Sequence, residues 1–268
     1  LASVSAVSVW AEEEEMSPDE TVRLAAVTAS SLTQDTDGAY IIASESDYQQ
    51  FCDDIAGGYD YAEETVKLTD SIVVNQMAGS TTRRANIVLG QQFAGVFDGA
   101  NNTITLELVV TESKNEQPGV GLFSGLDGAT VKNLNLTADI NVTAEEYSVG
   151  GIAGYMSNGA QVIGCTVDGT IMSVNDAGGI VGKGICAAVI RDCINNADVS
   201  ATKGKTGGIA SSMYYVASSD GALMIENCAN NGAITASEGG YTGGIVGLAA
   251  TAVVSGCTNN GAVTGNST

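Results

Sequence analysis

The triplet Gly-Gly-Ile occurs four times in the second half of the chain, beginning at positions 150, 178, 207 and 243. A cysteine follows each triplet within an apolar stretch, at positions 165, 193, 228 and 257. Successive triplets are 28, 29 and 36 residues apart, and successive cysteines are 28, 35 and 29 apart. Two independent markers therefore indicate one repeating unit of about 28 residues, lengthened once by an insertion. Such an array must fold by stacking similar units on one another.

Alignment of the units on the cysteine shows what each repeat contributes. The residue three positions earlier is always β-branched and apolar: Val162, Ile190, Ile225 and Val254. The residue directly before the cysteine is always of a type that tolerates unusual backbone angles: Gly164, Asp192, Asn227 and Gly256. An earlier stretch fits the same frame, with Val131, Asn133 and then Leu134 in place of cysteine. The pattern predicts a sharp corner followed by an inward apolar position that cysteine fills as leucine does.

A further apolar position recurs six residues after the cysteine or leucine: Ile140, Ile171, Val199, Ile234 and Val263. Short β-branched runs separated by Gly, Asn and Asp are typical of strands and turns, and the repeats contain no helical periodicity. Three short strands cannot bury their own apolar face, so each must pair in parallel with its equivalent in the next unit. We predict an all-β protein, a parallel β-helix of about five to six coils, right-handed because parallel crossovers prefer that hand.

Residues 46–56 are the one segment with a convincing helical pattern. Tyr48, Phe51, Cys52 and Ile55 share one face, and Ser46 with Gln49 resembles a capping box. We expect this helix to cover the N-terminal end of the stack, because an open β-helix end exposes core side chains and unpaired backbone groups.

Several segments resemble the GLUG-motif arrays of bacterial secreted and cell-surface proteins. They are FDGANNTITLEL (97–108), GLFSG (121–125), GGIAG (150–154) and GGIVG (178–182 and 243–247), together with the leading segment 40–74. The resemblance covers about residues 40–268, although GGIAS (207–211) departs from it. It implies a right-handed β-helix and an extracellular location. It implies little about activity, since such arrays accompany adhesins and some large secreted peptidases.

The flanking segments suggest an exported protein. Residues 1–11 resemble the end of a signal peptide, and 12–38 form an acidic leader that we expect to be disordered. Residues 39–92 are predicted to form the N-terminal cap with helix 46–56 and the first strands, and 93–268 the repeat array, truncated at its C-terminus. The predicted protein is secreted, associated with the cell surface, not inserted in a membrane, and monomeric within a longer chain.

Six cysteines in an exported chain raise the possibility of disulfides. Because the four repeat cysteines replace an inward leucine, we instead predict a stack of unbonded thiols. The chain has no histidine and no Cys-x-x-Cys pair, so we predict no metal site and no cofactor. The acidic sequence DTDG (35–38) is a candidate calcium loop, but it lacks the remaining ligands of one.

Asparagine pairs recur at 195–196, 230–231 and 259–260, which predicts amide ladders between coils. A ligand-binding row of amides is the alternative.

Arg191 and Glu226 occupy one equivalent outward position, which predicts a surface ion pair. The lengthened unit (211–222) carries Tyr214 and Tyr215, which could either bind a partner on a projecting loop or pack back onto the flank.

Catalysis has little support in the sequence. Without histidine, Ser-His-Asp, Cys-His and zinc-peptidase sites are excluded within this chain. Polysaccharide lyases and glycoside hydrolases need converging carboxylates, whereas the coil carboxylates fall at different repeat positions: Asp168, Asp176, Asp192, Asp198 and Glu226. We therefore predict no catalytic residues.

The net charge of -21 argues against nucleic acid as a partner. The expected function is a stalk or adhesion module that binds a host or matrix glycan or protein; a carbohydrate-active or glycan-binding β-helix is the alternative.

Overall fold

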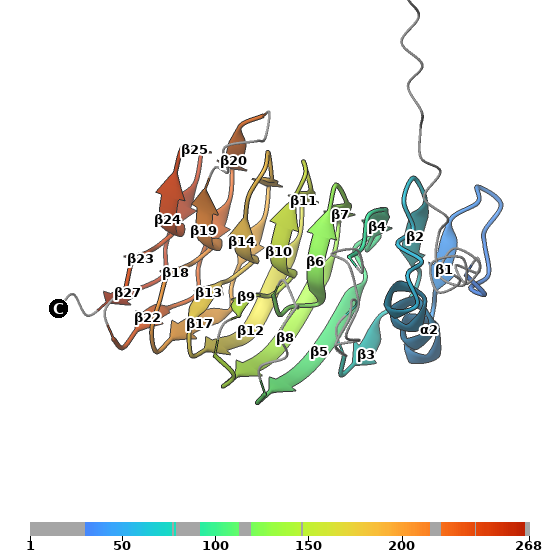
Figure 1. Ribbon diagram of the computed structural model, residues 1–268, viewed down its shortest axis with the longest axis horizontal. Coiled ribbons are helices and arrows are strands. Elements are labelled where there is room, and N and C mark those ends of the chain that lie inside the picture. Colours follow the sequence, from blue (N-terminus) through green and yellow to red (C-terminus); the bar gives the residue numbers. More distant parts are fainter. Residues whose placement is uncertain are drawn as a thin grey trace, which may run out of the picture.

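The computed structural model describes residues 30–76, 78, 92–112, 119–145, 147–214, 221–238 and 240–265. They form a parallel β-helix whose strands lie rung beside rung along the long axis, with one helix near the N-terminal end (Figure 1). This confirms the predicted fold class. No helix among the described residues is long and apolar enough to cross a membrane.

The longest uninterrupted stack is an eight-stranded sheet, which we call sheet A. Its strands, in order, are β1 (Tyr40–Ile42), β2 (Thr65–Leu68), β4 (Val96–Asp98), β7 (Thr130–Lys132), β11 (Gln161–Ile163), β15 (Val189–Arg191), β20 (Leu223–Glu226) and β25 (Ala252–Ser255). Six of these lie within residues 93–268, and β1 and β2 extend the same sheet toward the N-terminus. The parallel stack thus starts before the repeats become recognisable.

Three further sheets complete the coils. Sheet B contains β3 (Ile72–Val74), β5 (Thr103–Val110), β8 (Asn135–Val142), β12 (Thr166–Ser173), β16 (Ile194–Asn195), β17 (Asp198–Ala201), β21 (Ala229–Asn230), β22 (Ile234–Ala236), β26 (Thr258–Asn259) and β27 (Val263–Gly265). Sheet C contains β6 (Phe123–Asp127), β10 (Ala153–Ser157), β14 (Val181–Gly184), β19 (Ala210–Tyr214) and β24 (Val246–Ala250). Sheet D, a fourth and very short strand per coil that we did not expect, contains β9 (Ser148–Gly150), β13 (Asp176–Gly178), β18 (Thr206–Gly207) and β23 (Thr242–Gly243).

The predicted corner is present in every aligned coil. The residue between sheets A and B has a left-handed φ each time: Asn133 at 52°, Gly164 at 61°, Asp192 at 55°, Asn227 at 53° and Gly256 at 62°. Only Gly, Asn and Asp adopt this conformation readily, which explains their recurrence. The apolar positions on either side are in register from coil to coil, as Ile190 with Ile225 in sheet A and Ile171 with Val199 in sheet B show.

Both glycines of the Gly-Gly-Ile triplet are required by close packing inside the coil. A Cβ on Gly207 would lie within 3.0 Å of the Ala210 carbonyl oxygen. A Cβ on Gly208 would meet the Gly244 carbonyl of the next coil and the side-chain amide of Asn230. Gly207 and Gly243 pair in register across the lengthened unit, so the insertion leaves the stack intact. The triplet is therefore the place where the chain turns tightly against the amide ladder.

The repeat cysteines form the predicted column of thiols. All six cysteines of the chain are free. Each repeat thiol donates toward a carbonyl of the preceding coil, for example Cys193 Sγ to Val162 O at 3.5 Å. Hydrogen bonding with Cys165, together with burial, raises the pKa of Cys193 above its ordinary value of 9.0. Cys257 differs from our expectation because it is only partly buried: no described coil covers it.

Alkylation should therefore sort the six thiols of the native protein into two groups. At alkaline pH, the partly buried thiols of Cys186 and Cys257 should react first. The four buried thiols should react at least about a hundredfold more slowly, because their modification requires local unfolding. They are Cys52, Cys165, Cys193 and Cys228. Mass-mapped alkylation before and after denaturation measures this. Disulfides among the repeat cysteines in the native protein would contradict it.

Two amide ladders confirm the expectation from the paired asparagines. The inner ladder runs from Asn195 Nδ2 to Asn230 Oδ1 and from Asn230 Nδ2 to Asn259 Oδ1, each at 2.7 Å. The outer ladder joins Asn196, Asn231 and Asn260 at 2.8 Å per step. Asn195 and Asn230 are fully buried. Their amides satisfy polar groups that the sheets leave unpaired at the turn.

The ion pair predicted between Arg191 and Glu226 is wrong. These residues are neighbours in register, but Arg191 Nε lies 3.6 Å from Asp192 Oδ2 instead. Because Asp192 follows Arg191 directly in the sequence and its carboxylate is exposed, the guanidinium contacts this carboxylate of its own coil. Such a surface contact contributes roughly 0 to 1 kcal/mol.

The helix α2 (Glu45–Ala56) covers the core at the N-terminal end, as predicted. Tyr48, Phe51, Cys52 and Ile55 are buried. The capping residue is Ser44 rather than Ser46: Asp47 N donates to Ser44 Oγ at 3.2 Å, and Ala43 N donates to Asp47 Oδ2 at 3.0 Å. Asp47 performs the reciprocal role that we assigned to Gln49, whose amide instead donates to Asp53. The box begins two residues earlier than the sequence suggested.

The flanks of the array differ from expectation in two places. Residues 30–38, which we placed in a disordered leader, include a turn bridged to β1 through Gln34 and Tyr40, and Leu32 is buried. Residues 1–29, with the expected signal segment, lie outside the described residues. In the lengthened unit, residues 211–214 belong to β19 and Met213 is fully buried, so the departure from the coil begins later than residue 211.

Candidate functional site: an acidic pocket on the outer face of sheet A

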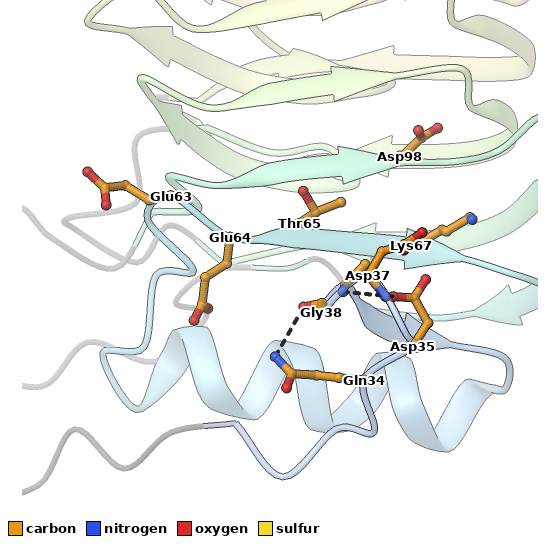
Figure 2. A pocket seen from close by; sticks show the side chains of 10 residues that line it. Gln34, Asp35, Asp37, Gly38, Glu63, Glu64, Thr65, Lys67 and Asp98 are labelled. Carbon is orange, nitrogen blue, oxygen red and sulfur yellow. Dashed lines mark hydrogen bonds between the residues drawn. The ribbon is translucent and has the colours of Figure 1, made fainter.

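A pocket of about 390 Å³ lies where the turn before β1 faces the first strands of sheet A (Figure 2). Its lining is dominated by carboxylates: Asp35 and Asp37 from the turn, Glu63 and Glu64 before β2, and Asp98 at the end of β4. Among the described residues that line the pocket, Lys67 of β2 is the one basic residue. The turn holds the DTDG sequence that we considered as a calcium loop, so the structure brings this motif together with three carboxylates that the sequence did not connect with it.

The turn itself is held by its first carboxylate. Asp35 Oδ1 accepts hydrogen bonds from the backbone N–H groups of Asp37 at 2.9 Å and Ala39 at 3.0 Å. Gln34 Nε2 donates to Gly38 O at 3.1 Å, and Gly38 has a φ of 85°. This is the local hydrogen bonding by which Asp favours turns. The Asp35 carboxylate therefore serves the turn.

The second wall is fixed by tyrosines. Tyr59 donates its hydroxyl to the Glu64 carboxylate at 2.6 and 2.8 Å, and Tyr40 OH lies 3.5 Å from it. Burial, followed by the hydrogen bond to Glu64, raises the pKa of Tyr59 above its ordinary value of 10.0. Glu64 is thereby held as a hydrogen-bond acceptor in the wall of the pocket.

Asp98 is the most strongly held carboxylate of the pocket. Its Oδ1 accepts from Ala100 N at 3.0 Å and from Asn133 Nδ2 at 3.1 Å, and its Oδ2 lies 3.3 Å from Lys132 Nζ. Partial burial alone would raise the pKa of Asp98. The Ala100 N–H, the Asn133 amide and the Lys132 ammonium outweigh burial, so the pKa lies below its ordinary value of 3.8.

This arrangement predicts an acid-sensitive contribution to stability. A carboxyl with a lowered folded-state pKa stabilises the fold above its unfolded pKa, and the contribution is lost as pH falls through the folded value. Asp98→Asn should therefore lower the free energy of unfolding by roughly 1 to 2 kcal/mol at pH 7, and the difference should shrink below about pH 4. Urea unfolding at pH 7 and pH 3 measures it. Asp139→Asn, which changes an exposed carboxylate of β8, is the control; equal losses for both variants would contradict the prediction.

The carboxylates of the pocket are suited to attract cations. Within the described part of the chain, no three Asp, Glu or Cys side chains come together in an arrangement that could hold a metal ion. Three of the five carboxylates already accept hydrogen bonds within the protein. The remaining groups, Asp37 and Glu63, give the rim a negative potential that Lys67 offsets in part.

The coil carboxylates considered for catalysis link neighbouring coils instead of converging. Asp176 Oδ2 lies 3.3 Å from Lys205 Nζ and its Oδ1 accepts from Lys205 N. Asp168 accepts from Asn196, and Asp198 accepts from Ala233 N at 2.8 Å. Asp192 accepts from Asn227. These carboxylates therefore join neighbouring coils of the stack through hydrogen bonds and an ion pair.

The flank beside the insertion places an ammonium group between two aromatic rings. Lys183 Nζ lies 4.8 Å from the ring centroid of Tyr214 and 5.5 Å from that of Tyr155. Burial, then the nearby Cys186, Tyr214 and Asp127, raises the pKa of Tyr155 to about 12. Tyr214 thus packs against the flank, which was one of our two expectations for it. Tyr215 lies outside the described residues.

Parallel coils that repeat their corners, thiols and amides, closed by a terminal helix, define the β-solenoid class. The profile of the GLUG motif matches residues 145–172, which include β9, β10, β11 and all but the last residue of β12. The chain therefore carries the GLUG motif within a β-helix, which confirms the resemblance seen in its sequence.

Comparison of structures supports the same fold. The chain is similar to the crystal structure of a proposed immunoglobulin A1 protease from Bacteroides ovatus, with a TM-score of 0.55 and 18% sequence identity over 87% of this chain and 86% of that one. No curated protein matches the sequence significantly. At this identity the likeness concerns the fold alone.

Proposed function

We propose that the chain is a rigid β-helical stalk or adhesion module of a secreted or cell-surface protein and performs no catalysis of its own. The observation that supports this is the set of side-chain ladders that join successive coils of the array. Polar groups on the coils, including Asp176, Asn195 and Asn230, bond to the next coil. A solenoid held in this way resists bending and presents long regular faces to a partner.

The face best suited to a partner is the outer surface of sheet B, where β5, β8 and β12 are the longest strands. Val109, Met172 and Ile194 are 69%, 48% and 40% exposed there, on a face that carries threonine, serine and asparagine side chains and the exposed carboxylates of Glu107 and Asp139. Apolar groups set among hydroxyls and amides suit a glycan or a protein surface. We propose that adhesion takes place through this outer surface of sheet B.

Binding and turnover assays together test it. A glycan array and a panel of matrix proteins should show binding that Val109→Lys with Met172→Lys lowers at least tenfold, while Val189→Lys on the outer face of sheet A leaves it unchanged. Cleavage of a polysaccharide, or of immunoglobulin A1, by the purified chain would overturn the proposal in favour of an enzyme. Equal effects of both sets of lysines would overturn the assignment of the face.

A further inference from the structure

Two tyrosines and a lysine from three neighbouring coils gather on the outer surface of sheet C. β10, β14 and β19 are successive strands of this sheet (Figure 1). Tyr155 of β10 pairs in register with Lys183 of β14, and the inward positions of β10 and β19 hold the buried Met156 and Met213. Because side chains alternate between the two faces of a strand, Tyr155, Lys183 and Tyr214 point outward.

Lys183, the lysine of this cluster, contacts aromatic rings instead of a carboxylate. Its ammonium lies 4.8 Å from the ring centroid of Tyr214 and 5.5 Å from that of Tyr155. Three other lysines each lie 3.3 to 3.7 Å from an Asp or Glu oxygen: Lys132, Lys203 and Lys205. A ring face attracts the positive charge but has no lone pair to accept an N–H group, and an ammonium has three such donors. Lys183 therefore keeps donors for a ligand.

The charges around the cluster suit an anion better than those on the other faces do. The strands of sheet C contain one acidic residue, Asp127, and one basic residue, Lys183. Asp127 already accepts from Ser157 Oγ at 3.3 Å and from Asn158 Nδ2 at 2.5 Å. The pocket beside sheet A carries five carboxylates, and the outer face of sheet B carries exposed ones. Because charges more than about 8 Å apart are largely screened at physiological salt, these distant carboxylates act only weakly on an anion beside Lys183.

We propose that Tyr155, Lys183 and Tyr214 form a subsite for one anionic sugar unit of a glycan. The Lys183 ammonium binds the carboxylate or sulfate group of the sugar through charge-assisted hydrogen bonds. The two tyrosines contact the C–H groups of the sugar ring, whose partial positive charge is attracted to an aromatic ring face. Their hydroxyls can donate to or accept from the hydroxyls of the sugar.

A sugar suits this cluster better than a protein surface does, because the cluster is small. A stable protein interface buries about 800 Å² on each partner, whereas the three side chains here are each only partly exposed. Small-molecule sites commonly combine aromatic side chains with a few well-placed polar groups. The subsite lies on sheet C, so it does not depend on the adhesion surface proposed for sheet B.

Titration calorimetry with three tetrasaccharides tests the class of ligand. The first contains glucuronic acid, the second is the same molecule with its carboxylates reduced to primary alcohols, and the third carries sulfate groups instead of carboxylates. The reduced form should bind at least about tenfold more weakly than the first, because it has no charged acceptor for Lys183. Comparison of the first and third probes shows which anionic group the subsite prefers. Equal binding of the first two probes, or no binding of either anionic probe, would overturn the proposal.

Variants of the lysine locate the subsite. Lys183→Gln should weaken binding of the preferred anionic probe at least about tenfold, and Lys183→Arg, which keeps the charge beside the rings, should retain most of the affinity. Lys203→Gln removes the same charge from an exposed lysine outside sheet C and is the matched control, with parent-like affinity. Val109→Lys with Met172→Lys should also leave the affinity unchanged, so this subsite and the adhesion surface of sheet B are measured separately. Equal losses for Lys183→Gln and Lys203→Gln would contradict the subsite.

Cys186 reports occupancy of the subsite without any substitution. Its thiol is partly buried and is one of the groups near Tyr155. A saturating concentration of the anionic probe should therefore slow alkylation of Cys186 at least about fivefold, while the alkylation rate of Cys257 stays the same. An unchanged rate for Cys186 in the saturated protein would place the bound sugar elsewhere and overturn the assignment.

Discussion

Replacing both Phe51 and Ile55 by alanine is expected to lower the free energy of unfolding by about 5 to 8 kcal/mol, which exceeds or nearly equals the whole stability of many domains. Phe51 is fully buried and its ring lies 5.2 to 6.2 Å from those of Tyr61, Phe93, Phe97 and Phe123. Ile55 is 1% exposed on the same face. Because these side chains fill the end of the core, their loss should also expose apolar surface and promote association through the N-terminal end.

Thermal and urea unfolding with size-exclusion chromatography measure both effects. Gln49→Ala changes the exposed face of the same helix and should alter stability by no more than about 0.5 kcal/mol. Parent-like melting and elution of the double variant would show that α2 is not the cap and that residues 40–70 form a separate element.

The second large effect is expected from Gly208→Ala. The added methyl group would overlap the Gly244 carbonyl and the Asn230 amide, so the coils must separate or the inner ladder must break. Overpacking costs about 1 to 3 kcal/mol, and orphaned buried amides about 1 to 3 kcal/mol more. We therefore expect a loss of roughly 2 to 6 kcal/mol by urea unfolding.

Gly159→Ala separates packing from conformational strain. Gly159 has a φ of 79°, and a Cβ there meets nothing within 4 Å, so the variant measures strain alone, about 1 to 2 kcal/mol. A loss for Gly208→Ala no larger than for Gly159→Ala would show that close packing does not require the second glycine of the triplet.

The repeat pattern was predictable because residue types with the same local conformational preference recur at the same position of every unit. Corners need a left-handed φ and inward positions need β-branched or thiol side chains, and both recur at fixed spacing, as Asp192 and Ile190 illustrate. The helix was found from its apolar face, but its start was misplaced because Ser44 and Ser46 both head plausible capping boxes. Only the backbone path shows which serine adopts the extended conformation of an N-cap, as Ser44 does with φ -148°.

By itself the sequence determined the coil period, the corners, the thiol and amide ladders and the presence of an N-terminal helix, because each is a local rule repeated along the chain. The tertiary structure alone decided how Asp35, Glu64 and Asp98 meet in one pocket, since they lie in different coils and no spacing relates them. It also decided that Arg191 turns to Asp192 rather than to Glu226, and that Cys257 is only partly buried while Cys228 is buried. Burial in a solenoid depends on whether a neighbour covers the rung, and that is a property of the stack rather than of any one repeat.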